Sequence, residues 1–345
     1  MKQLMIIGLV LMGLILVLPT ILVLGFNKEE ASQIDMESPN ESDPDVEEVW
    51  IDETVVENQE TVAVFRTEAE AVEHVPFEEY IVGVVAREMP ASYELEALKA
   101  QALTARTYLI QLMTMGNLEI PHGADITDTE SHQVYASAEE LQEEWGSDYE
   151  WRIARIQEAV KATEGMIITY DGAPIDALYF STSNGYTENS EEYYSYEFPY
   201  LRSVESPWDL ESPRYYNEVT MSVAEFEEKL GINVAETGLG EIVGRTTGGN
   251  VAKVAFGDVE YTGRQVREEK LGRDIIASSD FTWERRGDTI HIETRGWGHG
   301  VGMSQFGANG MAQEGHDFRD IIHHYYQGVE ITEANQVMRS LMASG

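Results

Sequence analysis

The sequence predicts an α+β fold, with a mixed sheet and helices in two lobes around a groove, preceded by one transmembrane helix. Short apolar segments typical of strands alternate with segments whose apolar residues recur every three or four positions. The hydrophobic content of 43% suffices for a folded core, and an uncharged run occupies the beginning of the chain. The expected strands lie near residues 62–66, 166–170, 176–181, 251–256 and 289–294. The expected helices lie near residues 77–88, 94–114, 151–163 and 304–327.

The composition restricts the classes of ligand. The chain has 345 residues, and its 62 Asp plus Glu against 23 Lys plus Arg give a formal net charge of −39. Such a charge repels phosphate backbones, which argues against nucleic acid as a partner. It also provides no long-range attraction to anionic lipids or polymers, so local contacts must hold any such ligand. Cysteine does not occur in the sequence, which excludes disulfides and thiolate metal sites.

The uncharged run at residues 4–26 predicts a membrane anchor. Its 23 residues are mostly apolar, and roughly 20 such residues span a bilayer core as a helix. Lys2 precedes the run and Glu29 and Glu30 follow it closely, which favours a single pass with residues 1–3 in the cytoplasm and the remainder outside. A cleaved signal peptide is the alternative, but its apolar region normally has about 7–15 residues followed by a small-residue cleavage site.

Residues 27–60 have the composition of a linker. Between residues 29 and 60 there are 13 acidic side chains and no basic one. Such a segment repels itself and buries too little apolar surface to fold, so we expect it to be disordered. The folded domain is expected at residues 61–331, followed by a C-terminal tail at 332–345.

The first predicted helix, 77–88, places one carboxylate on an apolar face. Pro76 suits the first turn of the helix, and Pro90 ends it. Ile81 and Val85 lie on the same face as Glu88. Burial and the position in the last turn both raise the pKa of Glu88, which would then donate a proton near neutral pH. On this pattern alone, a solvated glutamate at a helix end is the alternative.

The second predicted helix, 94–114, begins after Ser92 and carries one apolar stripe with several alanines that permit close packing. Gln101, Arg106 and Tyr108 are candidates to line a groove. They are equally compatible with positions on the surface or at the edge of the core.

The polar loop at 181–189 follows an expected strand. Ser181, Ser183, Asn184 and Gly185 offer hydroxyl and amide groups that suit the hydrogen bonds of a sugar. An ordinary turn is the alternative. Tyr200 begins a further expected strand, and its ring is a candidate to stack on a ligand.

The segment 296–307 has the densest pattern of glycines. Alternating glycines allow positive φ angles and close approach to a ligand or another chain, and their spacing differs from that of nucleotide-binding loops. Trp297, His299, Ser304 and Gln305 form either the wall of a site or a structural turn before a helix capped by Ser304. Two helical pieces are expected here, ending near Gly315 and Gly328. The nearby His316, His323 and His324 have no zinc-protease spacing and are interpreted as structural.

Five segments together resemble one known family. In their order and residue patterns they are similar to the stage II sporulation protein D family, which includes the amidase enhancers, and the similarity extends over roughly residues 60–331. The segments lie at residues 77–90, 97–108, 181–189, 200–204 and 296–305.

The resemblance implies a membrane-anchored lytic transglycosylase. Such an enzyme cleaves MurNAc–GlcNAc bonds of peptidoglycan strands already stripped of stem peptides and forms 1,6-anhydro-MurNAc. The family's catalytic acid falls on Glu88, and the groove is expected to bind glycan without a cofactor. The expected substrate-binding residues are Gln101, Arg106, Tyr108, Ser181, Ser183, Asn184, Gly185, Tyr200, Trp297, His299, Ser304 and Gln305.

The resemblance also implies a setting and partners. The chain is expected in the cell membrane at the sporulation septum and engulfing membrane, acting during engulfment of the forespore. The implied partners are the denuded glycan strands, the amidase stage II sporulation protein P and the membrane protein stage II sporulation protein M.

Some relatives bind zinc through Cys and His in the region that matches residues 125–135. This chain has Thr127, Ser131 and His132 there, which leaves His122 and His132 without thiolate partners, so no metal is expected. Two other functions remain open. These are a non-catalytic activator of a cell-wall amidase and a muramidase that uses water.

Overall fold

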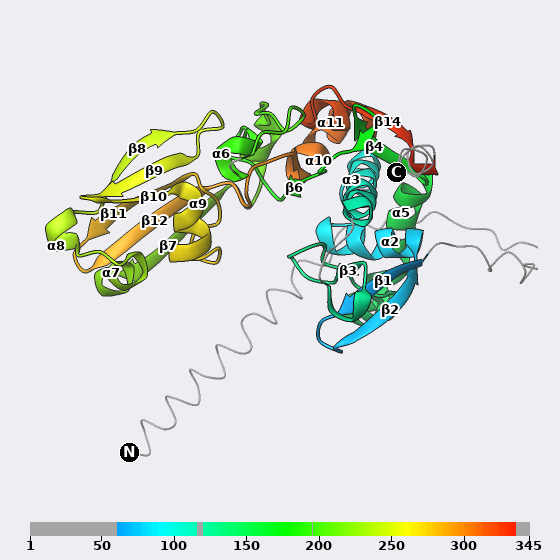
Figure 1. Ribbon diagram of the computed structural model, residues 1–345, viewed down its shortest axis with the longest axis horizontal. Coiled ribbons are helices and arrows are strands. Elements are labelled where there is room, and N and C mark those ends of the chain that lie inside the picture. The colour runs from blue at the N-terminus through cyan, green and yellow to red at the C-terminus, as the bar shows by residue number, and fades with distance from the viewer. Residues whose placement is uncertain (1–60, 116–119, 195, 336–345) are drawn as a thin grey trace, which may run out of the picture. The chain divides into compact units, whose positions relative to one another are not determined.

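The computed structural model describes residues 61–115, 120–194 and 196–335, all within one structural unit that comprises residues 56–345. Over these residues the fold is α+β, as predicted (Figure 1). The predicted anchor at 4–26 and linker at 27–60 lie outside the described residues. Among the helices that the described ranges contain, none has the length and apolar character needed to span a membrane.

The described chain begins with a small sheet. Strands β1 (Thr61–Arg66) and β2 (Ala71–Pro76) form an antiparallel hairpin, and the short β3 (Ile126–Thr127) pairs with β1 in parallel. Val62 and Val64 alternate inward and are fully buried, which is the pattern of a strand with one face on the core. The expected strand at 62–66 is thus confirmed.

Helix α2 (Phe77–Glu88) follows β2 directly and has the predicted bounds. Its inward face buries Ile81, Val84 and Val85 completely. The residue after the helix, Met89, has an extended backbone, as expected of a residue that precedes a proline. The sequence therefore ends the helix at Glu88, at the edge of the core.

Three more helices pack around α2. They are α3 (Leu95–Met115), α4 (Ala138–Trp145) and α5 (Tyr149–Ala162), and α2, α3 and α5 contact one another pairwise. Fully buried alanines on α3 permit this close packing. The helices expected at 94–114 and 151–163 are confirmed.

The end of the described chain returns to this core. Strand β14 (Glu330–Glu333) pairs with β4 (Met166–Tyr170), which also pairs with β5 (Ala173–Pro174). Helices α10 (Gln305–Gln313) and α11 (Phe318–Tyr325) pack on α3, in line with the two helical pieces expected. The Ser304 hydroxyl caps α10 by accepting a hydrogen bond from the Gly307 N–H, 3.2 Å away.

The strand expected at 176–181 is much shorter in the structure. Only β6 (Tyr179–Phe180) is a strand, and it pairs in parallel with β13 (Met303–Ser304). The residues before it bond irregularly, because the Asp176 N–H donates to the Tyr200 hydroxyl at 3.1 Å instead of to a neighbouring strand.

A second hydrophobic cluster lies between two antiparallel sheets, with β9 at 251–256 and β12 at 289–295 near their predicted positions. One sheet has the order β11 (Phe281–Arg286), β12 (Thr289–Arg295) and β7 (Tyr216–Ser222). The other has the order β10 (Val259–Thr262), β9 (Val251–Phe256) and β8 (Glu241–Arg245). Helix α7 (Val223–Leu230) packs on β7 and β12 (Figure 1). The other α-helices of the described residues are α6 (Ser190–Tyr194), α8 (Val234–Thr237) and α9 (Gly263–Gln265).

The ion pair between Arg106 and Glu78 provides a test of the core that α2, α3 and α5 form. The Arg106 side chain is fully buried on α3 and makes two hydrogen bonds to the Glu78 carboxylate, at 2.9 and 2.6 Å. Loss of the guanidinium leaves Glu78 without its partner and empties a buried site. Arg106→Gln is therefore expected to lower the free energy of unfolding by about 3 kcal/mol in urea denaturation.

The matched control is Arg286→Gln, which removes an arginine whose ion pair with Glu284 is mostly exposed. This change is expected to cost less than about 1 kcal/mol. Equal costs for the two variants would contradict a structural role for Arg106.

Candidate functional site

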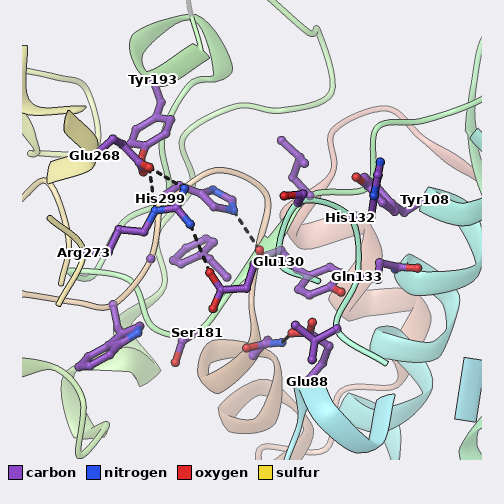
Figure 2. A pocket seen from close by; sticks show the side chains of 18 of the residues that line it. Glu88, Tyr108, Glu130, His132, Gln133, Ser181, Tyr193, Glu268, Arg273 and His299 are labelled. Atoms are coloured by element: carbon purple, nitrogen blue, oxygen red, sulfur yellow. Dashed lines mark hydrogen bonds and ion pairs between the residues drawn. The ribbon is translucent and has the colours of Figure 1, made fainter. Parts of the chain in front are cut away.

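A pocket of about 540 Å³ lies at the C-terminal end of α2 (Figure 2). Its walls come from α2, from the loop after β3, from β6, from the segment 264–273 beside the second hydrophobic cluster, and from the glycine-rich segment. A volume in this range is usual for sites that bind small molecules or sugar units.

Glu88 lies in this pocket with an environment that favours its neutral form. Burial raises the pKa of the Glu88 carboxyl to about 7, and the charge of Glu130 also raises it, while hydrogen bonds from Gln305 and Tyr179 lower it. The Gln305 Nε2 donates to Glu88 Oε2 over 3.3 Å. The loss of hydration exceeds the effect of these donors, so a large fraction of this carboxyl is protonated at neutral pH.

The loop after β3 reaches the pocket because α2 lets it approach closely. A Cβ atom at Gly83 would overlap the carbonyl oxygen of Ala136 and the ring of Tyr135, so a glycine is required there. Tyr135 in turn stacks on Tyr80 of α2, with 5.2 Å between ring centroids. This contact carries residues 130–134 into the pocket wall.

The glycine-rich segment packs against the chain that leads into and follows β6. Gly302 has a φ of 84°, and a Cβ atom there would overlap the carbonyl oxygen of Leu178. Gly298 has a φ of 119° and lies against Phe180. The glycines therefore allow a close approach to another part of the same chain, where the sequence led us to expect a ligand or another chain. This approach places Trp297 and Gln305 at the pocket.

His299 is held by the backbone. Its Nε2 lies 3.0 Å from the Tyr179 carbonyl oxygen, and its Nδ1 accepts a hydrogen bond from the Val301 N–H at 3.1 Å. Burial and the positive charge of Arg267 lower the pKa of His299 to about 4. The ring is therefore neutral at pH 7, with Nε2 as the donor, and stabilises the loop beside β6.

The structure brings together six of the thirteen predicted site residues at this pocket, namely Glu88, Tyr108, Ser181, Trp297, His299 and Gln305. The other seven do not line it. They are Gln101, Arg106, Ser183, Asn184, Gly185, Tyr200 and Ser304.

Two of these seven, Gln101 and Arg106, lie on α3 with their side chains buried in the core. Gln101 is fully buried, and its Oε1 accepts a hydrogen bond from Gln305 Nε2 at 3.4 Å. The Arg106 guanidinium is paired with the Glu78 carboxylate. The apolar stripe of α3 explains both positions, because it turns this part of the helix into the core.

The polar loop has mostly structural partners. Ser183 and Ser304 both donate to the buried Asp209, at 2.6 and 2.7 Å. Asn184 Nδ2 donates to the Gly248 carbonyl oxygen at 2.9 Å, and the Gly185 N–H donates to Ser183 Oγ at 3.0 Å. The sequence correctly indicated many hydrogen-bonding groups here, but they are used to join segments of the chain.

Tyr200 also has a structural position. Its ring stacks on Phe198 with centroids 5.2 Å apart, and its hydroxyl accepts a hydrogen bond from the Asp176 backbone N–H.

The pocket contains charged residues that sequence reasoning did not select. Figure 2 shows Glu130 projecting into the pocket between Glu88 and Arg273, and the Arg273 guanidinium lies 3.4 Å from the Glu130 carboxylate. Glu268 forms ion pairs with both Arg267 and Arg273. Nothing in the sequence distinguishes these residues from the many other charged side chains, since only the fold brings them together.

The structure also tests the donor set for a metal ion. His132 Nδ1 lies 2.7 Å from the Thr127 hydroxyl, and burial lowers the pKa of this histidine. Within the part of the chain that the structure describes, no three His, Asp or Glu side chains gather closely enough to hold a metal ion.

Comparison with known proteins identifies the family. Residues 65–170 match the family model described as Stage II sporulation protein. The chain is 47% identical over 333 residues to stage II sporulation protein D of Bacillus amyloliquefaciens, which covers 96% of each chain. It is 46% identical to the Bacillus subtilis protein of the same name, over 99% of each chain. The chain belongs to the stage II sporulation protein D family.

The family extends to a more distant relative. The chain is 30% identical over 304 residues to a protein of Bacillus subtilis named amidase enhancer, covering 72% of this chain and 40% of the relative. The resemblance stated from the sequence is thus confirmed, and the chain is a sporulation protein related to an amidase enhancer.

The environment of Glu88 can be measured directly. We expect ¹³C NMR titration to give a pKa of about 7 for its carboxyl. Gln305→Leu removes a donor that favours the ionised form, so this variant should have a still higher Glu88 pKa. Gln313→Leu, at an exposed position of the same helix, should leave the value unchanged. The same Glu88 pKa in both variants would show that Gln305 does not act on this carboxyl.

Proposed function

We propose that the chain is a membrane-anchored lytic transglycosylase that cleaves MurNAc–GlcNAc bonds of peptide-stripped peptidoglycan. The observation that carries the proposal is the carboxyl of Glu88, whose pKa is raised to about 7 in a pocket of sugar-sized volume. A glycosidic oxygen needs a proton as its bond breaks, and a carboxyl that stays protonated near neutral pH supplies one.

The reaction follows from this single acid. Glu88 donates its proton to the glycosidic oxygen, and the bond to the muramyl C1 breaks with an oxocarbenium-like transition state. The muramyl 6-hydroxyl then attacks C1 from within the same sugar, and the ionised Glu88 accepts its proton. The product is 1,6-anhydro-MurNAc, and Glu88 ends protonated as it began. Gln305 Nε2, 3.3 Å from the carboxylate, favours the ionised state between the two transfers.

The internal nucleophile makes a second catalytic carboxylate unnecessary, whereas hydrolysing glycosidases ordinarily use two. Glu130 and Glu268 also line the pocket, and each is paired with Arg273. A muramidase that uses Glu130 to activate water is the competing enzymatic function. The relative named amidase enhancer favours a third function, in which the domain binds and stimulates an amidase.

The proposed setting is the engulfment of the forespore. Residues 4–26 anchor the chain in the cell membrane with the folded domain outside, at the septum and engulfing membrane. The amidase stage II sporulation protein P removes stem peptides before this chain cleaves the strand, and stage II sporulation protein M is the membrane partner. The similarity to stage II sporulation protein D over nearly the whole chain supports this setting.

The mass of the products separates the three functions. Incubation of the protein with peptide-free glycan strands is expected to yield fragments one water lighter than hydrolysis products. Glu88→Gln should lower the rate by a factor of about 10² or more, because it removes the acid but keeps the shape. Glu150→Gln, at an exposed position of α5, should retain full activity. Reducing ends would instead indicate the muramidase, and intact strands with a stimulated amidase would indicate the activator.

The pH dependence of cleavage gives a second test. Only protonated Glu88 donates, so the rate should be highest below its pKa and fall as the pH rises through about 7. Above that value the rate should decrease about tenfold per pH unit. If the rate instead began to fall near the ordinary pKa of a glutamate, well below neutral pH, the buried carboxyl would not be the proton donor.

A further inference from the structure

Two arginines at the Glu88 pocket differ from the other arginines of its wall. Arg214 and Arg264 are both exposed, and neither forms an ion pair with any Asp or Glu that the structure describes. The formal net charge of −39 makes acidic side chains plentiful, so two arginines of the pocket wall without an acidic partner are candidates to contact a ligand.

The remaining arginines of the pocket are neutralised by carboxylates. Arg87 pairs with Glu144, and Arg267 and Arg273 both pair with Glu268. The uncompensated positive charge of the wall therefore lies on Arg214 and Arg264.

Both guanidinium groups lie on aromatic rings. Arg214 lies 5.1 Å from the ring centroid of Trp297, and Arg264 lies 5.2 Å from those of Tyr193 and Tyr194. One nitrogen of each makes a further hydrogen bond, from Arg214 to the Ser181 hydroxyl at 3.4 Å and from Arg264 to the Tyr193 carbonyl oxygen at 3.2 Å. Stacking orients a guanidinium and leaves most of its N–H groups available for a ligand.

An aromatic ring beside an available guanidinium suits a sugar that carries a carboxylate. The ring packs on the apolar face of the sugar, and the guanidinium binds the two carboxylate oxygens through parallel hydrogen bonds. A muramyl residue carries a lactyl ether, whose carboxyl is a neutral amide while a stem peptide is attached. Hydrolysis of that amide leaves a carboxylate on every muramyl residue.

We propose that Arg214 and Arg264 bind lactyl carboxylates of the glycan strand and thereby select muramyl residues whose stem peptide has been removed. This inference rests on the proposed function for the identity of the ligand. The acidic chain repels an anionic strand at long range, so discrimination depends on these local contacts. One strand offers a carboxylate in every disaccharide, so a single strand carries more than one ligand for these arginines.

The test uses the full chain in detergent with Glu88→Gln, so that binding is measured without cleavage. Fluorescently labelled peptide-free strands are compared with the same strands after conversion of the lactyl carboxylates to methylamides, by fluorescence anisotropy. The protein is expected to prefer the carboxylate strands. Adding Arg214→Gln or Arg264→Gln should weaken binding of these strands about tenfold and leave binding of the methylamide strands unchanged.

Arg319→Gln is the matched control. Arg319 is also exposed, also lies on an aromatic ring, that of Phe318 at 4.3 Å, and does not line the pocket. The Arg319→Gln variant should bind both kinds of strand as tightly as the protein that carries Glu88→Gln alone. Added salt should reduce the preference for carboxylate strands.

Three results would overturn the inference: equal binding of the two strands by the parent, an equal loss for both strands in the arginine variants, or failure to bind either strand. The proposed function is judged separately, by the cleavage products of the protein that retains Glu88. Absence of cleavage together with a carboxylate preference would overturn the transglycosylase and leave the carboxylate site standing.

Discussion

The loss of hydration at the Glu88 carboxyl is the constraint on which the arrangement of the surrounding residues depends. Helix α2 buries its apolar face and ends at Glu88 because of Pro90, so the carboxyl is carried to the edge of the core. Gln305 and Tyr179 donate hydrogen bonds to it, and these donors offset part of the cost of burial. The balance leaves a pKa of about 7, at which both protonation states are accessible. A fully solvated carboxyl would be ionised, and one without donors would hold its proton too firmly to release it.

Close contacts between backbones bring the pocket walls to this carboxyl. Gly83 lets the loop after β3 pack directly on α2, and Gly302 lets the glycine-rich segment pack on the chain before β6. Any larger residue at either position would push a wall away from Glu88. The neutral ring of His299 joins the glycine-rich segment to β6. Its Nε2 donates to the Tyr179 carbonyl oxygen, and its Nδ1 accepts from the Val301 N–H. Close packing between backbone segments therefore forms the walls of the pocket, and the charged side chains project from these walls.

The sequence predicted most securely what depends on short-range patterns. The spacing of apolar residues and Pro90 identified α2 and the position of Glu88, and the glycine spacing identified a close approach of chains. The buried position of Arg106 could not be predicted from such patterns, because its pairing with Glu78 depends on how α2 and α3 pack. Strand β7, with alternating polar residues and mostly exposed positions, has too weak an apolar pattern to be identified. Glu130 and Arg273 are distant in sequence, and only the assembled fold places them at one pocket.

Elevated pKa values alone do not identify the functional carboxyl. Burial also raises the pKa of Glu188 to about 7 and that of Asp176 to about 6. Glu188 is almost wholly enclosed, accepts a hydrogen bond from Thr246 and has an Oε2 atom without a hydrogen-bond partner. Neither residue lines the Glu88 pocket, so neither can reach a ligand there. Glu88 combines a raised pKa with access to a pocket and a donor poised for its ionised form, and a proton that is to be transferred requires all three.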